Sequence, residues 1–577
     1  MWWIVACAEE PVPERDCGGT LYAGAVVVDA VSRHEMAQVC VEGEVIAWVE
    51  ANEAVPGGAV DLSGRFLAPG LVESHAHLAH SGATVLVDDT LEFNLRAQLY
   101  FGVTTVVDVG GPVSLFDLRD RLLGPSPRVV ASGPFLTAEG SHPCETMPNP
   151  DLCTLTDTGE EAAALVDAGA DVLKVALADA AFSPWGATPR LDLDALDTIA
   201  AQGVPVLAHV DTDQDAIDAL AHGADLLAHP PFAGAVGPEA LEAARGARAV
   251  HSTVSAFAGV AELGSADLDA MVVPEAVREN WAYVQAHPEV LVEGWAAASA
   301  GWAGNARTNL AAMGEAGVAI VPGSDAGYYF VPHGQGLHRE LAELEALGWG
   351  GEAILEAATL TPREALDLPG GRVEAGEPAD LLVLGADPRE GAAAWAEIET
   401  VIVRGEAHAR ASLHPDAATG TILSPAADGA CLSHEDCASG ACEGLSHACA
   451  ESCPEPWSVV NDCGAEAWCM PADGASDPRG ACREEDTCDL YAQDCTPAYY
   501  GMACIPYDED TNACWYGGPR VAGEACDTTA AETSCAPGLY CSPVTSRCYA
   551  LCDGECEVGS CHAVDRSDGS RWFGLCY

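Results

Sequence analysis

The chain has 577 residues, of which 49% are apolar, and its formal net charge is −63, from 88 acidic and 25 basic side chains. This length exceeds one ordinary core, so two or more domains are expected. An acidic surface of this strength repels phosphate backbones and anionic lipids, which argues against nucleic-acid binding. We interpret the acidity as a solvating surface suited to high salt rather than as an acidic binding face.

Residues 1–17 resemble a truncated or partial signal segment. The sequence ends its apolar run in Ile4-Val5-Ala6-Cys7, like a bacterial lipobox with Cys7 as the lipidated residue. Only six residues precede Cys7 and none is basic, so either the true start lies upstream or the match is a coincidence. Lipidation at Cys7 would anchor the protein to a membrane without spanning it. We therefore expect a secreted or cell-envelope protein, in the periplasm or at the surface.

Short β-like runs flank the central part of the chain. Residues 24–29 and 44–49 are apolar runs separated by glycine and proline, and residues 376–384 and 401–405 have the same character. Strands from the two ends can complete one sheet. The sequence therefore predicts a small composite β-sandwich subdomain made from residues 18–66 and 367–410.

Between these segments, residues 67–366 alternate apolar runs of four to six residues with helical patterns. The clearest unit has strand-like residues 204–209, helix-like residues 214–222 and strand-like residues 224–229, and both strands end in histidine. This alternation is typical of βα units and a parallel sheet. We predict an α/β fold, a (β/α)8 TIM-like barrel.

A pair of histidines follows the first predicted barrel strand. Residues two apart on a strand point the same way, so His75 and His77 can face one cavity as half of a site for a divalent metal. An isolated pair of this kind is weak on its own, because core histidines produce it often.

Lys174 is the only lysine in the chain, and it lies in the apolar run 170–176. An unpaired ammonium group is costly in such a setting. Arginine could supply a charge there but not a nucleophilic amine, because guanidinium stays protonated. We therefore favour a chemical role for Lys174 over a side chain that snorkels to the surface.

Three further candidates close predicted strands: His209, His229 and Asp325. Functional side chains of a (β/α)8 barrel gather at the C-terminal ends of its strands. Each residue alone has a plain explanation in the core or a loop. Their joint occurrence in chain order predicts one site at the mouth of the barrel.

The order HxH, Lys, His, His, Asp resembles the amidohydrolase superfamily, in its imidazolonepropionase-like and prolidase-like branch. The similarity extends over residues 20–408 and includes the stretches PGLVESHAHL, GADVLK, LAHP and PGSDAG, and the segments 356–365 and 376–384. It implies a hydrolase that acts on amide, peptide or cyclic-amide C–N bonds through metal-activated water. Glu73 departs from the usual aspartate, and Ser141-His142 departs from the usual glycine-containing loop.

The resemblance also implies roles for single residues. One or two divalent ions, with zinc as the default, would be held by His75, His77, Lys174, His209, His229 and Asp325. Lys174 would be carboxylated to a carbamate that bridges two ions. Asp325 would serve as general base and then as general acid.

The substrate is expected to be a small molecule or a peptide, contacted by His142, His251 and Tyr328, with His333 also near the mouth. Two alternatives stay open. One is a mononuclear, imidazolonepropionase-like hydrolase of cyclic amides. The other is a non-catalytic secreted scaffold in which the C-terminal modules bind a partner.

Residues 411–430 are predicted to be a linker and residues 431–577 a set of disulfide modules. Twenty of the 25 cysteines lie in this tail, and the spacing Cys442-x6-Cys449-x3-Cys453 recurs at 541–552. Dense, even-numbered cysteines predict disulfides and an oxidising compartment, with zinc knuckles as the alternative. The tail would bind a surface or a protein partner. Outside it, we expect Cys144 to pair with Cys153 and Cys17 with Cys40.

Overall fold

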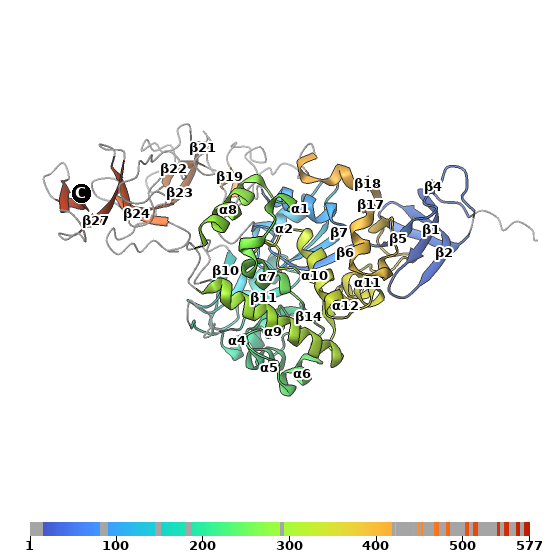
Figure 1. Ribbon diagram of the computed structural model, residues 1–577, viewed down its shortest axis with the longest axis horizontal. Helices are drawn as coiled ribbons and strands as arrows, with labels where there is room; N and C mark the ends of the chain where they lie inside the picture. The colour runs from blue at the N-terminus through green and yellow to red at the C-terminus, as the bar shows by residue number, and fades with distance from the viewer. Residues whose placement is uncertain are drawn as a thin grey trace, which may run out of the picture.

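The structure is a computed structural model (Figure 1). It describes residues 15–52, 54–80, 90–144, 152–178, 187–288, 294–417 and 422, together with the backbone of short strands between 442 and 576. Cys7 and the partial signal segment up to residue 14 lie outside the described residues.

The segments that flank the central region share one eight-stranded mixed sheet. The strands run in the order β18-β17-β16-β5-β1-β2-β3, and β4 pairs with β1. Their bounds are β1 Thr20–Val28, β2 Arg33–Glu42, β3 Val45–Ala51, β4 Val60–Asp61, β5 Phe66–Pro69, β16 Leu381–Leu384, β17 Ile398–Val403 and β18 Glu406–Ala409. The sheet buries its own apolar cluster, which includes Val27, Ile46 and Ile402. A disulfide joins Cys17 to Cys40, so this predicted pairing is confirmed.

The central region contains parallel strands in two sheets. One has the order β6-β7-β8 and the other β10-β9-β11-β12-β13-β14-β15. The bounds are β6 Leu71–Ala76, β7 Val103–Asp108, β8 Arg128–Ala131, β9 Phe135–Thr137, β10 Cys153–Leu155, β11 Leu173–Ala176, β12 Val206–His209, β13 Leu226–Leu227, β14 Ala249–His251 and β15 Ile320–Val321. The predicted α/β architecture with parallel strands is confirmed.

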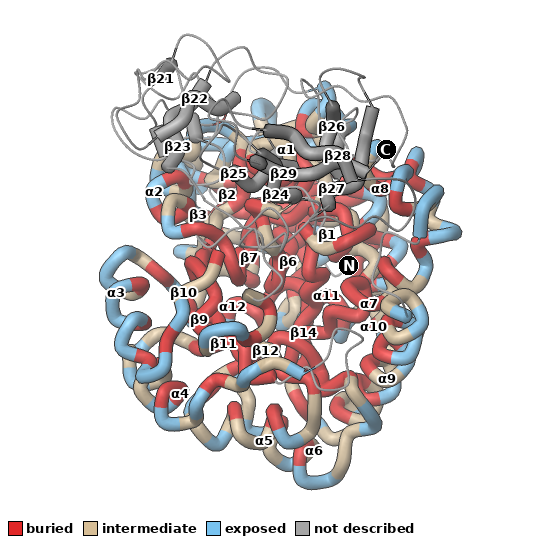
Figure 2. Tube along the Cα trace, turned by 90° about the vertical axis from the view of Figure 1, so that its left-hand side faces the viewer, coloured by how far each residue is buried: buried red, intermediate tan, exposed pale blue. Residues whose placement is uncertain are grey.

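Helices cover these strands. They are α1 Thr90–Tyr100, α2 Ser114–Asp120, α3 Glu161–Ala168, α4 Leu193–Ala200, α5 Asp213–Ala221, α6 Pro238–Ala244, α7 Val254–Ala261, α8 Glu275–Ala286, α9 Trp295–Glu315, α10 Gln335–Ala346, α11 Gly351–Thr359 and α12 Thr361–Ala365. Figure 2 shows buried strands at the centre, with exposed residues on the surrounding helices. Among the described residues, no helix combines the length and the apolarity that crossing a membrane requires.

The strand ladder is TIM-like but is not one continuous barrel in the described residues. β8 pairs with β7, whereas the next segment, β9, pairs with β11. Gly133, with φ +70°, and Pro134 separate β8 from β9, and proline has no N–H to donate to a ladder. At the other end, the Asp325 N–H donates to His75 O at 2.8 Å and the His77 N–H to Ala326 O at 2.8 Å. These bonds tie the segment after β15 to β6.

Local sequence signals position the strands that carry the candidate residues. Helix α3 ends at Gly169, whose φ of +115° suits glycine, and β11 follows within a few residues. Helix α5 begins with a capping box in which Thr212 and Asp215 bond each other's backbone N–H. Both devices fix where a helix starts or ends relative to the neighbouring strand. They therefore also help to fix the positions of the site residues on these strands.

The first part of the predicted linker is packed rather than extended. Residues Arg410–Leu413 and Pro415–Ala417 form short 3₁₀ turns, and Leu413 and Ile422 are both 2% exposed within the main core cluster. Burial of these two apolar side chains stabilises the packed conformation relative to a solvated linker.

Beyond residue 440, the structure gives backbone strands only: β19 Cys442–Glu443, β20 Ala448–Cys449, β21 Ser452–Cys453, β22 Ala467–Pro471, β23 Gly480–Glu484, β24 Met502–Pro506, β25 Asn512–Tyr516, β26 Leu539–Ser542, β27 Arg547–Cys552, β28 Cys561–Asp565 and β29 Arg571–Cys576. They pair as antiparallel hairpins, and cysteines stand opposite one another in the β26–β27 and β28–β29 registers, among others. The side chains of this region lie outside the described residues, so its disulfides stay a prediction.

Candidate active site

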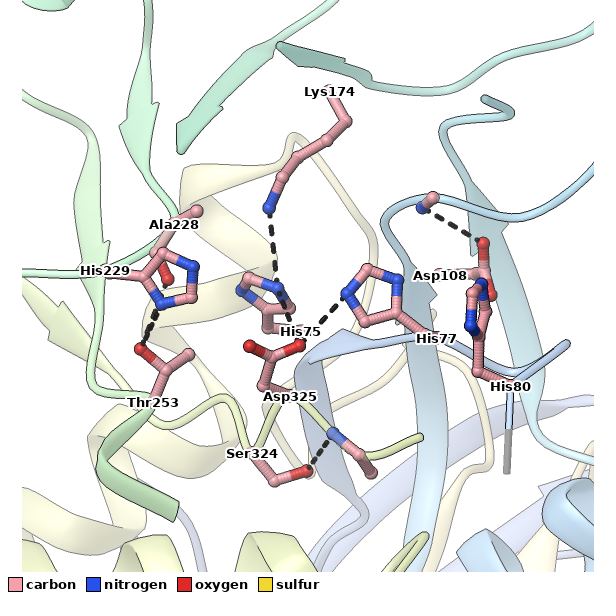
Figure 3. A network of polar contacts seen from close by, with 12 residues as sticks. His75, His77, His80, Asp108, Lys174, Ala228, His229, Thr253, Ser324 and Asp325 are labelled. Atoms are coloured by element: carbon pink, nitrogen blue, oxygen red, sulfur yellow. Dashed lines mark hydrogen bonds and ion pairs between the residues drawn. The ribbon is translucent and has the colours of Figure 1, made fainter. Parts of the chain in front are cut away.

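Five of the six predicted metal-site residues lie at or just beyond the ends of parallel strands, and Lys174 lies within one. His75 belongs to β6 and Lys174 to β11, and His209 is the last residue of β12. His229 and Asp325 follow β13 and β15. Figure 3 shows the Asp325 carboxylate between the imidazoles of His75 and His77, with Lys174 and His229 facing the same space. These predicted residues therefore lie close together in the structure.

Asp325 is the hub of this arrangement. Its Oδ1 lies 3.0 Å from His77 Nε2 and 3.5 Å from His75 Nε2. Ligand atoms of His75, His229 and Asp325 lie within 4.8 Å of one another, and all three residues are buried. Burial raises the Asp325 pKa, but the His77 hydrogen bond and the His77 and Lys174 charges outweigh it, so the pKa is lowered overall. Asp325 is thus held as a carboxylate.

Lys174 lies beside this hub with only 1% of its surface exposed. Its Nζ is 3.4 Å from His75 Nε2 and 5.6 Å from the centre of the Phe135 ring. Burial lowers the Lys174 pKa to about 7, and the nearby Asp325 carboxylate opposes that shift only in part. A substantial fraction of the amine is therefore neutral and nucleophilic near neutral pH.

His209 and His229 form the other side of the cluster, with ring centres 4.8 Å apart. Each has a hydrogen-bond partner beyond the cluster. His209 Nε2 lies 3.0 Å from Asp211 Oδ1, and His229 Nδ1 lies 2.7 Å from Thr253 Oγ1. Such outer partners orient the ring of a metal-binding histidine.

Three imidazoles of the cluster, those of His75, His209 and His229, are kept neutral. Burial is the main cause of a lowered pKa at His75, His209 and His229, and the Lys174 charge adds to it at each. Neutral imidazole is the form that binds a metal. Nitrogen and carboxylate donors that face one another in a buried space fit a divalent cation such as Zn²⁺. A second group, Cys17, Cys40 and Glu42, does not fit, because its two sulfurs are joined in a disulfide.

Two buried carboxyl groups brace the loops that carry these residues. Glu73 accepts hydrogen bonds from the Ser324 N–H at 2.9 Å, the Ser324 hydroxyl at 2.5 Å and the His75 N–H at 3.2 Å. Glu340 accepts from the Ser252 hydroxyl and, at 2.5 Å, from the Ser255 N–H. Glu73 therefore holds the residue before Asp325, and Glu340 holds Ser252 and Ser255, which lie one residue before and two residues after Thr253.

The predicted substrate contacts fall into different places. His251 has 1% exposure, its ring is 5.6 Å from that of His75, and neither ring nitrogen has a hydrogen-bond partner among the described residues. The His142 ring lies 4.9 Å from that of His209. The Tyr328 N–H donates to Asp325 O at 3.2 Å, and its ring packs against Trp295. His333 instead contacts His80 O at 3.0 Å and braces the loop after β6.

Several residues with a structural effect on the site are absent from the sequence-based predictions. Asp211 had a signal, since it stands two residues after His209 at a strand end. Thr253 had none, because its hydroxyl reaches His229 from the segment between β14 and α7, 24 residues further along the chain. Cys144, in the loop after β9, forms a disulfide with Cys153, the first residue of β10, so this predicted pairing is confirmed.

Comparisons with known proteins agree with this geometry. The model of the amidohydrolase family matches residues 66–407, more than half of the chain. Imidazolonepropionase from Arthrobacter sp. (strain FB24) is 37% identical over 103 residues, which cover 17% of this chain and 24% of that protein. Imidazolonepropionase from Rhodococcus jostii (strain RHA1) is 48% identical over 48 residues, which cover 8% and 12%. The matched segments thus span about a quarter or less of these relatives.

Solved structures show the same fold over a longer range. A Xaa-Pro dipeptidase with methionine bound in its active site is 21% identical, with a TM-score of 0.56, over 68% of this chain and 99% of that one. A putative prolidase from Bifidobacterium longum is 25% identical, with a TM-score of 0.54, over 67% and 94%. Taken with the family match and the strand-end cluster, this establishes that the chain belongs to the amidohydrolase family.

Proposed function

We propose that the protein is a metal-dependent hydrolase of C–N bonds with a binuclear site and a carboxylated Lys174. The observation that carries the proposal is the only lysine of the chain, buried with Nζ 3.4 Å from His75 Nε2 in the midst of the histidines. His75, His77 and Asp325 would hold one ion, and His209 and His229 the other. Zinc is the metal that this donor set suits best.

Carboxylation fits the chemistry of Lys174. The neutral amine forms an N–C bond to carbon dioxide and releases one proton to solvent, which leaves an anionic carbamate with two oxygens. An ammonium group among neutral histidines would repel metal ions, whereas a carbamate binds them. Arginine cannot undergo this step. A pKa lowered to about 7 supplies the neutral amine that the reaction needs.

The residues of this chain divide the work of hydrolysis. A divalent ion bound here supplies Lewis acidity and lowers the pKa of water to about 7. Asp325 takes a proton from the attacking water on a carboxylate oxygen and returns it to the leaving nitrogen. His251, with two buried ring nitrogens and no partner among the described residues, donates an N–H to a substrate oxygen. His142 beside His209 contacts the substrate at the other side.

A mononuclear hydrolase of cyclic amides is the second candidate. Two observations favour it: the local similarity to imidazolonepropionases, and the compact group His75, His229 and Asp325, which can hold one ion without Lys174.

We also propose that the protein is located in an oxidising compartment. The disulfides Cys17–Cys40 and Cys144–Cys153 support an oxidising compartment, which agrees with a secreted or cell-envelope protein. Lipid anchoring through Cys7 and partner binding by the tail extend this proposal and depend on residues outside the described part of the chain.

Metal content and labelled bicarbonate together test the binuclear site. We would express the full chain in an oxidising compartment, measure divalent ions per chain, and look for a carbamate ¹³C resonance after growth or incubation with ¹³C-bicarbonate. We expect about two ions and a resonance that Lys174→Ala and Lys174→Arg both abolish. A short carboxylate such as acetate should restore the second ion to Lys174→Ala but not to Lys174→Arg, in which the side chain fills the space. One ion, unchanged in Lys174→Ala and without a resonance, would favour the mononuclear candidate.

A further inference from the structure

Among the residues that the structure describes, Lys174 is the one lysine or arginine in the candidate site, and the arginines have partners elsewhere. Residues 1–430 hold Lys174 and eighteen arginines, and the structure describes all nineteen. The other six arginines belong to residues 431–577. A substrate carboxylate in a binding site is ordinarily paired with arginine, whose planar fork matches it. The partners of these eighteen arginines therefore indicate whether one of them is placed to bind a substrate carboxylate.

Most of them pair with carboxylates on the outside of the barrel or in the β-subdomain. Arg190, for example, lies 2.8 Å from Asp218 Oδ2 and 3.2 Å from Asp215 Oδ1. The others of this kind are Arg15, Arg33, Arg65, Arg96, Arg119, Arg121, Arg128, Arg245, Arg248, Arg307, Arg372 and Arg389. The remaining five donate to backbone carbonyls: Arg278, Arg339, Arg363, Arg404 and Arg410. None of these contacts involves one of the six candidate metal-site residues.

The surroundings of His209 and His229 are aromatic instead. The ring of Phe257 lies 5.9 Å from that of His229, and Phe232 lies 6.3 Å from His209. Phe232 also packs against Phe257 at 4.4 Å and against Trp302 at 5.7 Å. All three aromatic residues are at most 8% exposed. Across the cluster, Phe135 stacks on His77 at 5.6 Å. Apolar walls of this kind penalise an unpaired charge.

We propose that the substrate is an amide with no carboxylate next to its scissile C–N bond, neutral or cationic, that carries an apolar or aromatic group. The proposal rests on the proposed function. Carboxylation of Lys174 would remove the one lysine or arginine that the described residues place in the site, so beyond the metal ions no protein cation would pair with a substrate carboxylate. The chain's net charge of −63 also disfavours the approach of an anion. The aromatic rings would pack on the apolar group of the substrate.

Matched pairs of substrates test this proposal on the metal-loaded full chain. Each pair shares its acyl group and scissile bond and differs only in a terminal carboxylate or carboxamide, such as benzoyl-phenylalanine and benzoyl-phenylalanine amide, or leucyl-proline and leucyl-prolinamide. We expect kcat/KM to be at least tenfold higher for the carboxamide in each pair that is hydrolysed. In thermal unfolding, the carboxamide should raise Tm at a concentration at which the acid does not. Both differences should persist in about 1 M salt, where the Debye length is ~3 Å.

The outcomes separate the two proposals. Faster hydrolysis of the acids would overturn the substrate class and leave the hydrolase intact. A preference that disappears at high salt would also overturn it, because the discrimination would then come from the overall charge rather than from the site. Failure of every pair, with metal bound, would refute the proposed function and the substrate class together. Arg339→Gln is the control, since it removes the arginine that donates to Phe330 O, in the loop after Asp325. The ratio within each pair should not change in this variant.

Discussion

The two halves of the candidate site are held together in different ways. In the half formed by β6 and the segment after β15, Asp325 contacts His75 and His77 directly. In the half formed by β12 and β13, His209 and His229 lie side by side, and each is oriented by a residue outside the cluster, Asp211 or Thr253. In the first half, the candidate ligands contact one another. The second depends on neighbours that bind no metal.

This difference reflects how each half is encoded. The first half arises from two short motifs joined by backbone hydrogen bonds, with the buried Glu73 holding Ser324 next to Asp325. The second half requires the loop after β14, which Glu340 on α10 fixes through Ser252 and Ser255. Changes in the first half should therefore act on chemistry directly. Changes around the second should act through metal affinity and loop stability.

Asp325→Asn is expected to have the largest effect. The amide keeps the size of the side chain and tolerates the φ of +59° at this position, but it cannot take a proton. Loss of a general base and acid should lower kcat by about 10²–10⁴-fold. Asp211→Asn, the matched change in the second half, should cost only about 10–100-fold. Steady-state kinetics on a carboxamide substrate compares them, and equal losses would remove the distinction between the halves.

Thr253→Val is expected to weaken the second half by a smaller amount. The Thr253 hydroxyl lies 2.7 Å from His229 Nδ1 and 3.4 Å from Ala228 O, so it accepts from the imidazole N–H and donates to the carbonyl (Figure 3). This keeps the other ring nitrogen of His229 as the lone-pair donor. Valine has the same shape but lacks the hydroxyl, and metal affinity should fall about 10–100-fold.

The control for this change is Thr253→Ser, which retains the hydroxyl and should retain metal affinity. Thr253 has a φ of +41°, a strained value for a β-branched residue that valine shares and serine relieves. Competition with a chelator gives the metal affinity of each variant. If serine and valine lower it equally, the hydroxyl is not what orients His229.

The sequence allowed the candidate metal-site residues to be predicted, but not the residues that form hydrogen bonds to them. His75 and His77 were identifiable from strand periodicity, Asp325 from its position after a predicted strand, and Lys174 as the only lysine of the chain in an apolar run. The hydrogen bond of Thr253 joins residues 24 apart, and that of Glu340 to Ser252 joins residues 88 apart. No local pattern specifies such pairings, because they depend on which loops pack together. His333 illustrates the converse, since a histidine near a predicted mouth contacts His80 O instead.

The same reasoning explains which features of the fold could be predicted from the sequence. Alternating apolar runs predicted the parallel strands, and the paired flanking runs predicted strands that share one sheet. The break between β8 and β9 was not predicted, although Gly133 and Pro134 stand in the sequence, because a short apolar segment does not reveal which neighbour it pairs with.

Glu340→Gln should have the smallest effect, visible as a change in pH dependence. Burial raises the Glu340 pKa to about 7 from 4.5, against the hydrogen bonds of Ser252 and Ser255, while Glu343 raises it further. Glu73 and Arg307 also face this carboxyl group electrostatically. Between pH 4.5 and 7 the folded state keeps a proton that the unfolded state has released. The free energy of unfolding should therefore fall, by a few kcal/mol, as pH rises through this window.

Glutamine stays neutral at every pH, so the variant lacks this contribution. Thermal unfolding of chelator-treated protein from pH 5 to pH 8 measures it: the Tm of the wild type minus that of Glu340→Gln should be largest at pH 5 and decrease by several degrees towards pH 8. Glu242→Gln is the control, because Glu242 is 76% exposed in a surface pair with Arg245, and its Tm difference should stay nearly constant. A Tm difference for Glu340→Gln that is equally flat would mean that Glu340 is ionised throughout, and that it braces the Thr253 loop as a carboxylate.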